Sequence, residues 1–124
     1  MKKVSLVPML LMTGCAGLGV TAPDYAIGTY RGAVIGRGLC ILPAAELTVN
    51  VAKWSAYGDW YFEQQNIHER FLDGGVDSGG FLWGRRTPPY GMVYVGGYFT
   101  PDGSALDVRI DTHSCSYRGS IARI

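Results

Sequence analysis

Apolar and polar residues alternate with a period of two over most of the chain after residue 26. The clearest case is Ala105–Asp111, where Leu106, Val108 and Ile110 alternate with charged residues. This period places apolar side chains on one face of a β-strand and polar ones on the other. The same pattern, broken by glycine-containing turns, predicts further strands at 28–36, 46–54, 57–64, 66–72, 80–85, 90–100 and 116–123. No stretch shows a sustained 3.6-residue apolar period, so we expect an all-β fold.

The first fifteen residues follow a different pattern. Lys2 and Lys3 precede an apolar run of nine residues from Val4 to Met12. Such a run is too short to span a bilayer, which needs about 20 residues, but it is typical of the core of a secretory signal peptide. We therefore predict that residues 1–14 are a signal peptide that is removed on export.

The apolar run ends in Met12-Thr13-Gly14-Cys15, which resembles the lipobox of bacterial lipoproteins, with methionine where leucine is commoner. The resemblance implies cleavage after Gly14, diacylation of the Cys15 thiol and acylation of the new amino terminus. We accordingly expect attachment to a membrane through lipid on Cys15, because two or more acyl chains hold a protein stably at a bilayer. The alternative is an ordinary secretory signal followed by a chance cysteine.

The residues after Cys15 bear on location and domain limits. In the sorting rule of that family, an aspartate directly after the lipidated cysteine favours the inner membrane, whereas this chain has Ala16 and Gly17. In a cell with two membranes, the resemblance therefore implies the outer membrane, facing the periplasm. Residues 15–26 lack periodicity and are predicted to be a lipidated tether. Residues 27–124 are predicted to form a single β domain.

Once Cys15 is assigned to the lipid, Cys40 and Cys115 are the two remaining cysteines. An exported compartment permits disulfides, so we predict a Cys40–Cys115 bridge. It would close a loop of about 76 residues and stabilise the fold by up to about 4 kcal/mol on the chain-entropy model. The alternative is two separate buried thiols.

Two short segments near opposite ends of the predicted domain have similar sequences. Residues 30–34 read YRGAV and residues 117–121 read YRGSI. Two copies are too few for a repeat protein but suit equivalent strands in one sheet. Cys40 follows the first of these strands and Cys115 precedes the last, so a bridge would join antiparallel neighbours. We therefore predict a meander of seven or eight antiparallel strands that closes into a small barrel or barrel-like sandwich.

Charge argues against one class of partner. Loss of Lys2 and Lys3 with the signal peptide leaves nine basic residues against ten acidic ones. A nearly neutral domain has no electrostatic attraction to nucleic acid or to anionic lipid. We therefore expect no role in nucleic-acid binding.

Aromatic residues gather in two parts of the predicted domain, and exposed aromatic side chains contribute much of the free energy of binding at interfaces. One group surrounds a predicted turn near residue 57, and the other lies opposite the valines of the strand that begins near residue 90. The predicted partner surface comprises Trp54, Tyr57, Trp60, Tyr90, Tyr94 and Tyr98. The alternatives are a core position for the first group and a strand buried on both faces for the second.

Catalytic and metal-binding chemistry finds little support. His68 and His113 are the only histidines, which are too few for an ordered zinc site once the cysteines are paired. No nucleophile has a base and an orienting group at recognisable spacing. We expect no cofactor and no enzymatic activity. The sequence favours a lipid-anchored envelope protein that binds or supports another envelope component, and the alternatives are an inhibitor of a protease or lysozyme and a carrier of a small apolar ligand.

Overall fold

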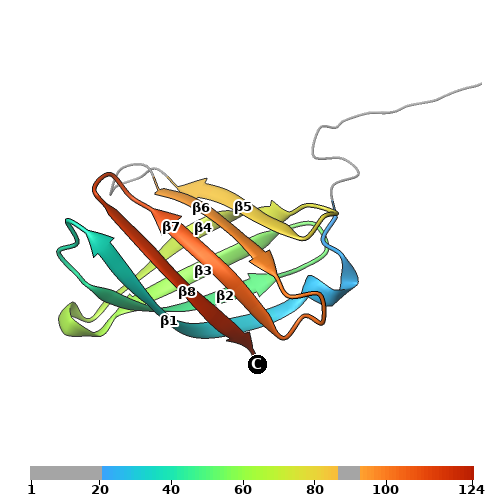
Figure 1. The fold of residues 1–124 in the computed structure, drawn as a ribbon, viewed down its shortest axis with the longest axis horizontal. Coiled ribbons are helices and arrows are strands. Elements are labelled where there is room, and N and C mark those ends of the chain that lie inside the picture. The colour runs from blue at the N-terminus through green and yellow to red at the C-terminus, as the bar shows by residue number, and fades with distance from the viewer. Residues whose placement is uncertain (1–20, 87–92) are drawn as a thin grey trace, which may run out of the picture.

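The computed structural model describes residues 21–86 and 93–124. Each strand pairs antiparallel with the next, and the first pairs with the last, so the sheet closes into an eight-stranded barrel (Figure 1). The predicted all-β meander is confirmed. The strands are β1 (Gly28–Gly38), β2 (Ala44–Val51), β3 (Ala56–Phe62), β4 (Ile67–Val76), β5 (Phe81–Arg86), β6 (Val93–Phe99), β7 (Ala105–Asp111) and β8 (Cys115–Arg123).

The two ends of the barrel carry different features. One end, called the tether end here, holds the 3-10 helix η2 (Asp24–Ala26) and the turns at 52–55, 77–80 and 100–104. The other, called the disulfide end, holds the loop at 39–43, the 3-10 helix η3 (Glu63–Gln65) and the turn at 112–114. Residues 22–26, which fall in the predicted tether, contact the barrel: Ala26 is fully buried, and the Ala22 N–H donates to the Lys53 carbonyl at 2.9 Å.

The period-two alternation decides which side chains fill the barrel. In β7, Leu106, Val108 and Ile110 point inward and are almost completely buried, as predicted. Aromatic rings occupy the interior near the disulfide end, where the centroids of Trp60 and Tyr117 lie 5.5 Å apart. All eight strands contribute buried hydrophobic side chains to one contiguous core. The interior is thus occupied by protein side chains, as in other eight-stranded barrels of small diameter.

The repeated YRG segments lie side by side on β1 and β8, as predicted. Each contributes a glycine that faces an aliphatic side chain of the other strand. A Cβ on Gly32 would lie 2.9 Å from Ile121 Cγ2, and one on Gly119 would lie 3.0 Å from Val34 Cγ1. The first distance is shorter than real Cβ contacts and the second is tighter than most of them, so the glycines make room for Ile121 and Val34 where the two strands meet.

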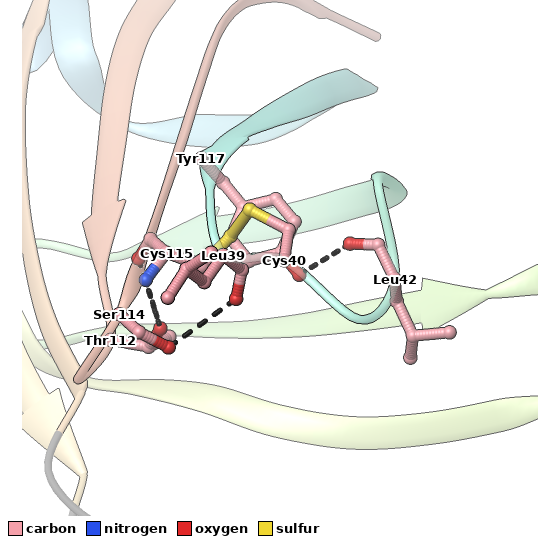
Figure 2. The surroundings of a disulfide bond; sticks show 7 residues. All are labelled: Leu39, Cys40, Leu42, Thr112, Ser114, Cys115 and Tyr117. Atoms are coloured by element: carbon pink, nitrogen blue, oxygen red, sulfur yellow. Dashed lines mark hydrogen bonds between the residues drawn. A yellow bond between two sulfur atoms is a disulfide. The ribbon is translucent and has the colours of Figure 1, made fainter.

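The predicted disulfide is present between Cys40 and Cys115, with the Cα atoms 5.0 Å apart (Figure 2). It fastens the loop that follows β1 to the first residue of β8. The Tyr117 hydroxyl donates to the Leu42 carbonyl at 2.6 Å, and the Ser114 hydroxyl donates to the Leu39 carbonyl at 3.3 Å. These contacts fix the 39–43 loop in place.

The first tyrosine of the repeat has a matching role at the tether end. The Tyr30 hydroxyl donates to the Ala26 carbonyl at 2.9 Å, which ties η2 to the barrel. Burial raises the pKa of both Tyr30 and Tyr117, with Arg123 partly offsetting the effect at Tyr30. Both hydroxyls therefore stay protonated, and each acts as a donor to a loop carbonyl at its own end of the barrel.

Candidate partner surface

Four of the six predicted surface residues are exposed. Tyr94 and Tyr98 lie on the outer face of β6 with 54% and 65% of their surface exposed, and Tyr57 lies on the outer face of β3 with 43% exposed. Trp54 is exposed in the turn between β2 and β3 at the tether end. Tyr90 lies outside the described residues. The exposed residues do not form one surface, since β3 and β6 are separated by two strands.

The prediction for Trp60 is wrong. Only 8% of this side chain is exposed, because Trp60 is in phase with Ala56, Gly58 and Phe62 on the inner face of β3. Its indole N–H donates to a carboxylate oxygen of Glu69 at 3.4 Å. Trp60 therefore belongs to the core and cannot contact a partner.

Sequence reasoning missed two aromatic residues on β5. Phe81 and Trp83 point outward, whereas Leu82 between them is fully buried. Phe81 lies opposite Tyr98 in the β5–β6 register, with ring centroids 4.9 Å apart. Trp83 is 45% exposed. The alternation of two aromatic residues around one leucine was the signal that could have identified this outer face.

Gly96 lies at the centre of these rings. It is directly opposite Trp83 on β5 and Arg109 on β7, and Tyr94 and Tyr98 flank it along β6. We call the set of Phe81, Trp83, Tyr94 and Tyr98 around Gly96 the aromatic face. An added Cβ at Gly96 would lie 3.3 Å from the Phe81 ring, so the glycine forms a floor with no side chain of its own.

A hollow of about 590 Å³ opens above this floor, between Phe81, Tyr94 and Tyr98 of the aromatic face and the outer surfaces of β7 and β8. Its second wall is charged and comprises Asp107, Arg109, Asp111 and Arg118. Two acids and two bases leave the wall without net charge. Across β6 and β7, Asp107 lies opposite Tyr98. Within residues 21–86 and 93–124, the Asp107 carboxylate makes no hydrogen bond or ion pair.

An ion pair organises the centre of the charged wall. Arg109 Nε donates to both carboxylate oxygens of Asp111, at 3.0 and 2.9 Å. Partial burial raises the pKa of Asp111, but the facing Ser116 and the guanidinium groups of Arg109 and Arg118 together lower it by more. Asp111 is therefore a carboxylate at neutral pH and holds Arg109 beside the Gly96 floor.

A second hollow of about 620 Å³ lies on the other side of Tyr94. Its lining includes Asp73, Trp83, Gly84 and Tyr94. The two hollows share Tyr94 and Val95 in their linings, so both border the same part of β6.

The tyrosines of β3 are in a different situation, because side chains of the barrel itself cover their rings. The Arg70 guanidinium lies 4.7 Å from the centre of the Tyr57 ring, and Asp59 binds Arg70 Nε at 2.8 Å. The His68 ring stacks on Tyr61 with centroids 4.2 Å apart.

No protein-family model, curated protein or solved structure matches this chain. The chemistry of the surface therefore rests on its own residues. In the described part of the chain, no group of three or more histidine, cysteine, aspartate or glutamate side chains is placed to hold a metal ion. Nor does any helix in that part have the length and apolar character needed to cross a membrane.

Proposed function

We propose that this protein is a lipid-anchored lipoprotein of the bacterial envelope, without enzymatic activity, that binds another envelope component through its aromatic face. The observation that carries the proposal is the set of exposed rings around the Gly96 hollow. Exposed aromatic side chains that border a hollow are typical of binding sites, because they bury a large area with little loss of conformational freedom. An isolated barrel gains nothing from leaving these rings in water.

The position of the proposed anchor is compatible with this use of the surface. The resemblance of residues 12–15 to a lipobox supports lipid on Cys15, and the described chain enters the barrel at the tether end, where Ala22 binds Lys53. The aromatic face lies on the side wall of the barrel. An anchor at one end leaves the wall accessible and raises the effective concentration of the site near the membrane.

The residues inside the barrel argue against the carrier alternative. Trp60, Phe71 and Tyr117 occupy the interior near the disulfide end, and ring centroids there lie 5.5 Å apart. A small apolar ligand would have to displace these rings from close contact. The displaced rings would lose both their buried area and their contacts with one another.

A second candidate function is inhibition of a protease. The observation that favours it is the 39–43 loop, where Leu39 and Ile41 are almost fully exposed although the loop is fixed by the disulfide. A loop held rigidly in one conformation binds with a smaller loss of entropy. Incubation of the protein with a panel of serine proteases at micromolar concentration tests this role, and unchanged protease rates would eliminate it.

Photo-crosslinking in living cells tests the proposed contact surface. A photoreactive residue in place of Tyr94 should give a defined adduct, because Tyr94 lines both hollows. The control is the same residue in place of Glu46, which is exposed on β2, four strands away around the eight-stranded barrel. Equal adducts at both positions, or none at position 94, would contradict the proposal.

Intact-mass spectrometry tests the proposed anchor separately. The mature protein should begin at Cys15 and carry the added mass of two or more acyl chains. A Cys15→Ala variant should lack these chains and leave the membrane fraction. A mature protein that begins with an unmodified Cys15 would show that the lipobox resemblance is misleading.

A further inference from the structure

We infer that the component bound by the aromatic face is a neutral glycan strand. This inference rests on the proposed function for the location of the site, and it adds the chemical class of the ligand. The aromatic face, the charged wall without net charge and the two adjoining hollows each limit what can bind there.

The closed sheet excludes one common way to bind a polypeptide. An extended peptide often adds to the free edge of a sheet, where backbone groups lack partners. Here β1 pairs with β8, so every strand of the barrel has a neighbour on both sides. β6 and β7 are paired on both sides along nearly their whole lengths, so a ligand that lies on these two strands must be recognised by side chains and not by strand addition.

The rings of the aromatic face suit one surface of a sugar. A pyranose ring presents a flat patch of C–H groups on one or both faces and hydroxyl groups around its edge. Trp83 and Tyr94 offer exposed ring surface beside a floor that has no side chain at Gly96. Tyrosine also carries a hydroxyl that can bind the edge of a ligand lying on its ring.

The charged wall supplies groups that bind the hydroxyl edge. Arg109 uses Nε for its bonds to Asp111, and within the described chain its two terminal nitrogens make no hydrogen bond. The Asp107 carboxylate accepts no hydrogen bond there either. Planar guanidinium and carboxylate groups can each engage two neighbouring hydroxyls. These donors and acceptors lie directly across the floor from the rings.

The charge balance of the wall discriminates among ligands. A nucleic acid or another polyanion is bound by a surplus of arginine and lysine, whereas this wall pairs two arginines with two aspartates. An acyl chain would bury the Asp107 carboxylate without a polar partner, at a cost in free energy. A neutral ligand rich in hydroxyls needs no surplus of positive charge on the wall, and its hydroxyls provide polar partners for the wall's charged groups.

The paired hollows favour a ligand with repeated units. Their volumes of about 590 and 620 Å³ each fall within the range of sites for small organic molecules. Tyr94 borders both. A glycan strand that crosses Tyr94 places one part in each hollow, which a single small molecule cannot do.

Binding to defined glycans tests the inference. Full-length protein in detergent is titrated by calorimetry with chitotetraose, cellotetraose, maltotetraose and mannotetraose, and is sedimented with purified peptidoglycan sacculi. We expect at least one tetrasaccharide to bind, and Trp83→Ala to weaken that binding about tenfold, as loss of an aromatic anchor does. The matched control is Trp54→Ala, an exposed tryptophan outside the aromatic face, which should change the affinity less than about twofold.

A second variant distinguishes a loss of glycan binding from a loss of folding. Gly96→Ser puts a side chain onto the floor, and the Phe81 ring need move only slightly to accept it. It should weaken glycan binding while leaving the denaturation midpoint nearly unchanged. Failure of all four glycans and of sacculi to bind, or equal weakening by Trp54→Ala and Trp83→Ala, would overturn the inference. A protein adduct from position 94 in that case would leave the proposed function standing, whereas no adduct would contradict both.

Discussion

Tyr57 on β3 and Trp83 on β5 have nearly the same exposed fraction, 43% and 45%, yet their surroundings differ. The Tyr57 ring is covered by the Arg70 guanidinium at 4.7 Å. No cation among the described side chains is placed over the Trp83 ring, which borders an open hollow. Two aromatic residues on one barrel thus use their exposed rings differently.

The difference shows that exposure alone does not identify a binding surface. On β3 and β4, the exposed rings are already satisfied by interactions within the barrel, because Arg70 covers Tyr57 and His68 stacks on Tyr61. A partner would have to displace these groups. On β5 and β6, the rings border hollows, and no cation or histidine among the described side chains covers them, so a partner can bury their exposed surface without displacing such a group. The second arrangement is the one that favours recognition.

The largest expected effect separates rings that stabilise the fold from rings that contact a partner. Trp60→Ala removes a buried ring from the core and should lower the free energy of unfolding by about 3–5 kcal/mol. Trp83→Ala truncates an outer side chain and should lower it by less than about 1 kcal/mol. Urea denaturation measures both values. Similar losses in the two variants would show that Trp83 stabilises the fold as much as Trp60 does. The distinction between core rings and partner-contact rings would then be wrong.

A smaller change in the free energy of unfolding should distinguish the hydroxyl of Tyr117 from that of Tyr94. Tyr117→Phe removes the donor to the Leu42 carbonyl and should cost about 1–2 kcal/mol, because a partly buried acceptor loses its partner. Tyr94→Phe removes an outer hydroxyl and should change stability by less than about 0.5 kcal/mol. Thermal or urea denaturation of the two variants provides the comparison. A larger loss in Tyr94→Phe would contradict the assignment of Tyr94 to partner contact.

Removal of the guanidinium that covers the Tyr57 ring should lower the free energy of unfolding by a modest amount. Arg70→Met removes the cation above the ring and the ion pairs with Asp59 and Asp73, all of them partly exposed. Such contacts contribute about 0.5–1 kcal/mol together and are screened by salt. The loss in unfolding free energy should therefore shrink between low and high ionic strength. A loss that is independent of salt would indicate that Arg70 acts by packing and not by its charge.

The smallest expected effect concerns the turn that joins β6 to β7 beside the charged wall. The Ser104 N–H and the Thr100 hydroxyl donate to Asp102 and lower its pKa to about 2. An unfolded aspartate has a pKa of about 3.9, so this stabilisation is fully present above that pH and is lost as the pH falls toward 2.

Asp102→Asn should therefore reduce the loss of stability between pH 4 and pH 2. Urea denaturation of the two proteins at both pH values measures this difference, and carbon NMR titration of the Asp102 carboxyl group reports its pKa directly. A carboxyl group that titrates near 4 in the folded protein would contradict the hydrogen bonds of this turn.

Much of the fold was predictable, because the periodicity of the strands and the closure of the sheet could be inferred from the sequence. The alternation in residues 105–111 predicted β7 with its correct bounds. Assignment of Cys15 to lipid in an exported protein left Cys40 and Cys115 to pair, which predicted the disulfide. The position of these cysteines after the first strand and before the last then predicted that the two strands are neighbours, and the similar segments near residues 30 and 117 were consistent with it.

The candidate site was harder to predict, because it depends on which face each residue takes and on register between strands. Tyr57 and Trp60 are three residues apart, so a regular strand cannot place both outside. That parity places one of the two residues in the core, and the structure shows that it is Trp60. The aromatic face, in contrast, requires Trp83, Gly96 and Arg109 to lie in one row across three strands. Register of this kind is set by the turns and core packing, and not by the pattern within one strand.

The most direct test compares the two groups of exposed rings in living cells. A photoreactive residue is placed at position 98 on the aromatic face in one strain and at position 57 on β3 in another. We predict a specific adduct, with glycan or with protein, from position 98 and none above background from position 57. An adduct from position 57 together with none from position 98 would contradict the claim that the aromatic face is the contact surface of this barrel.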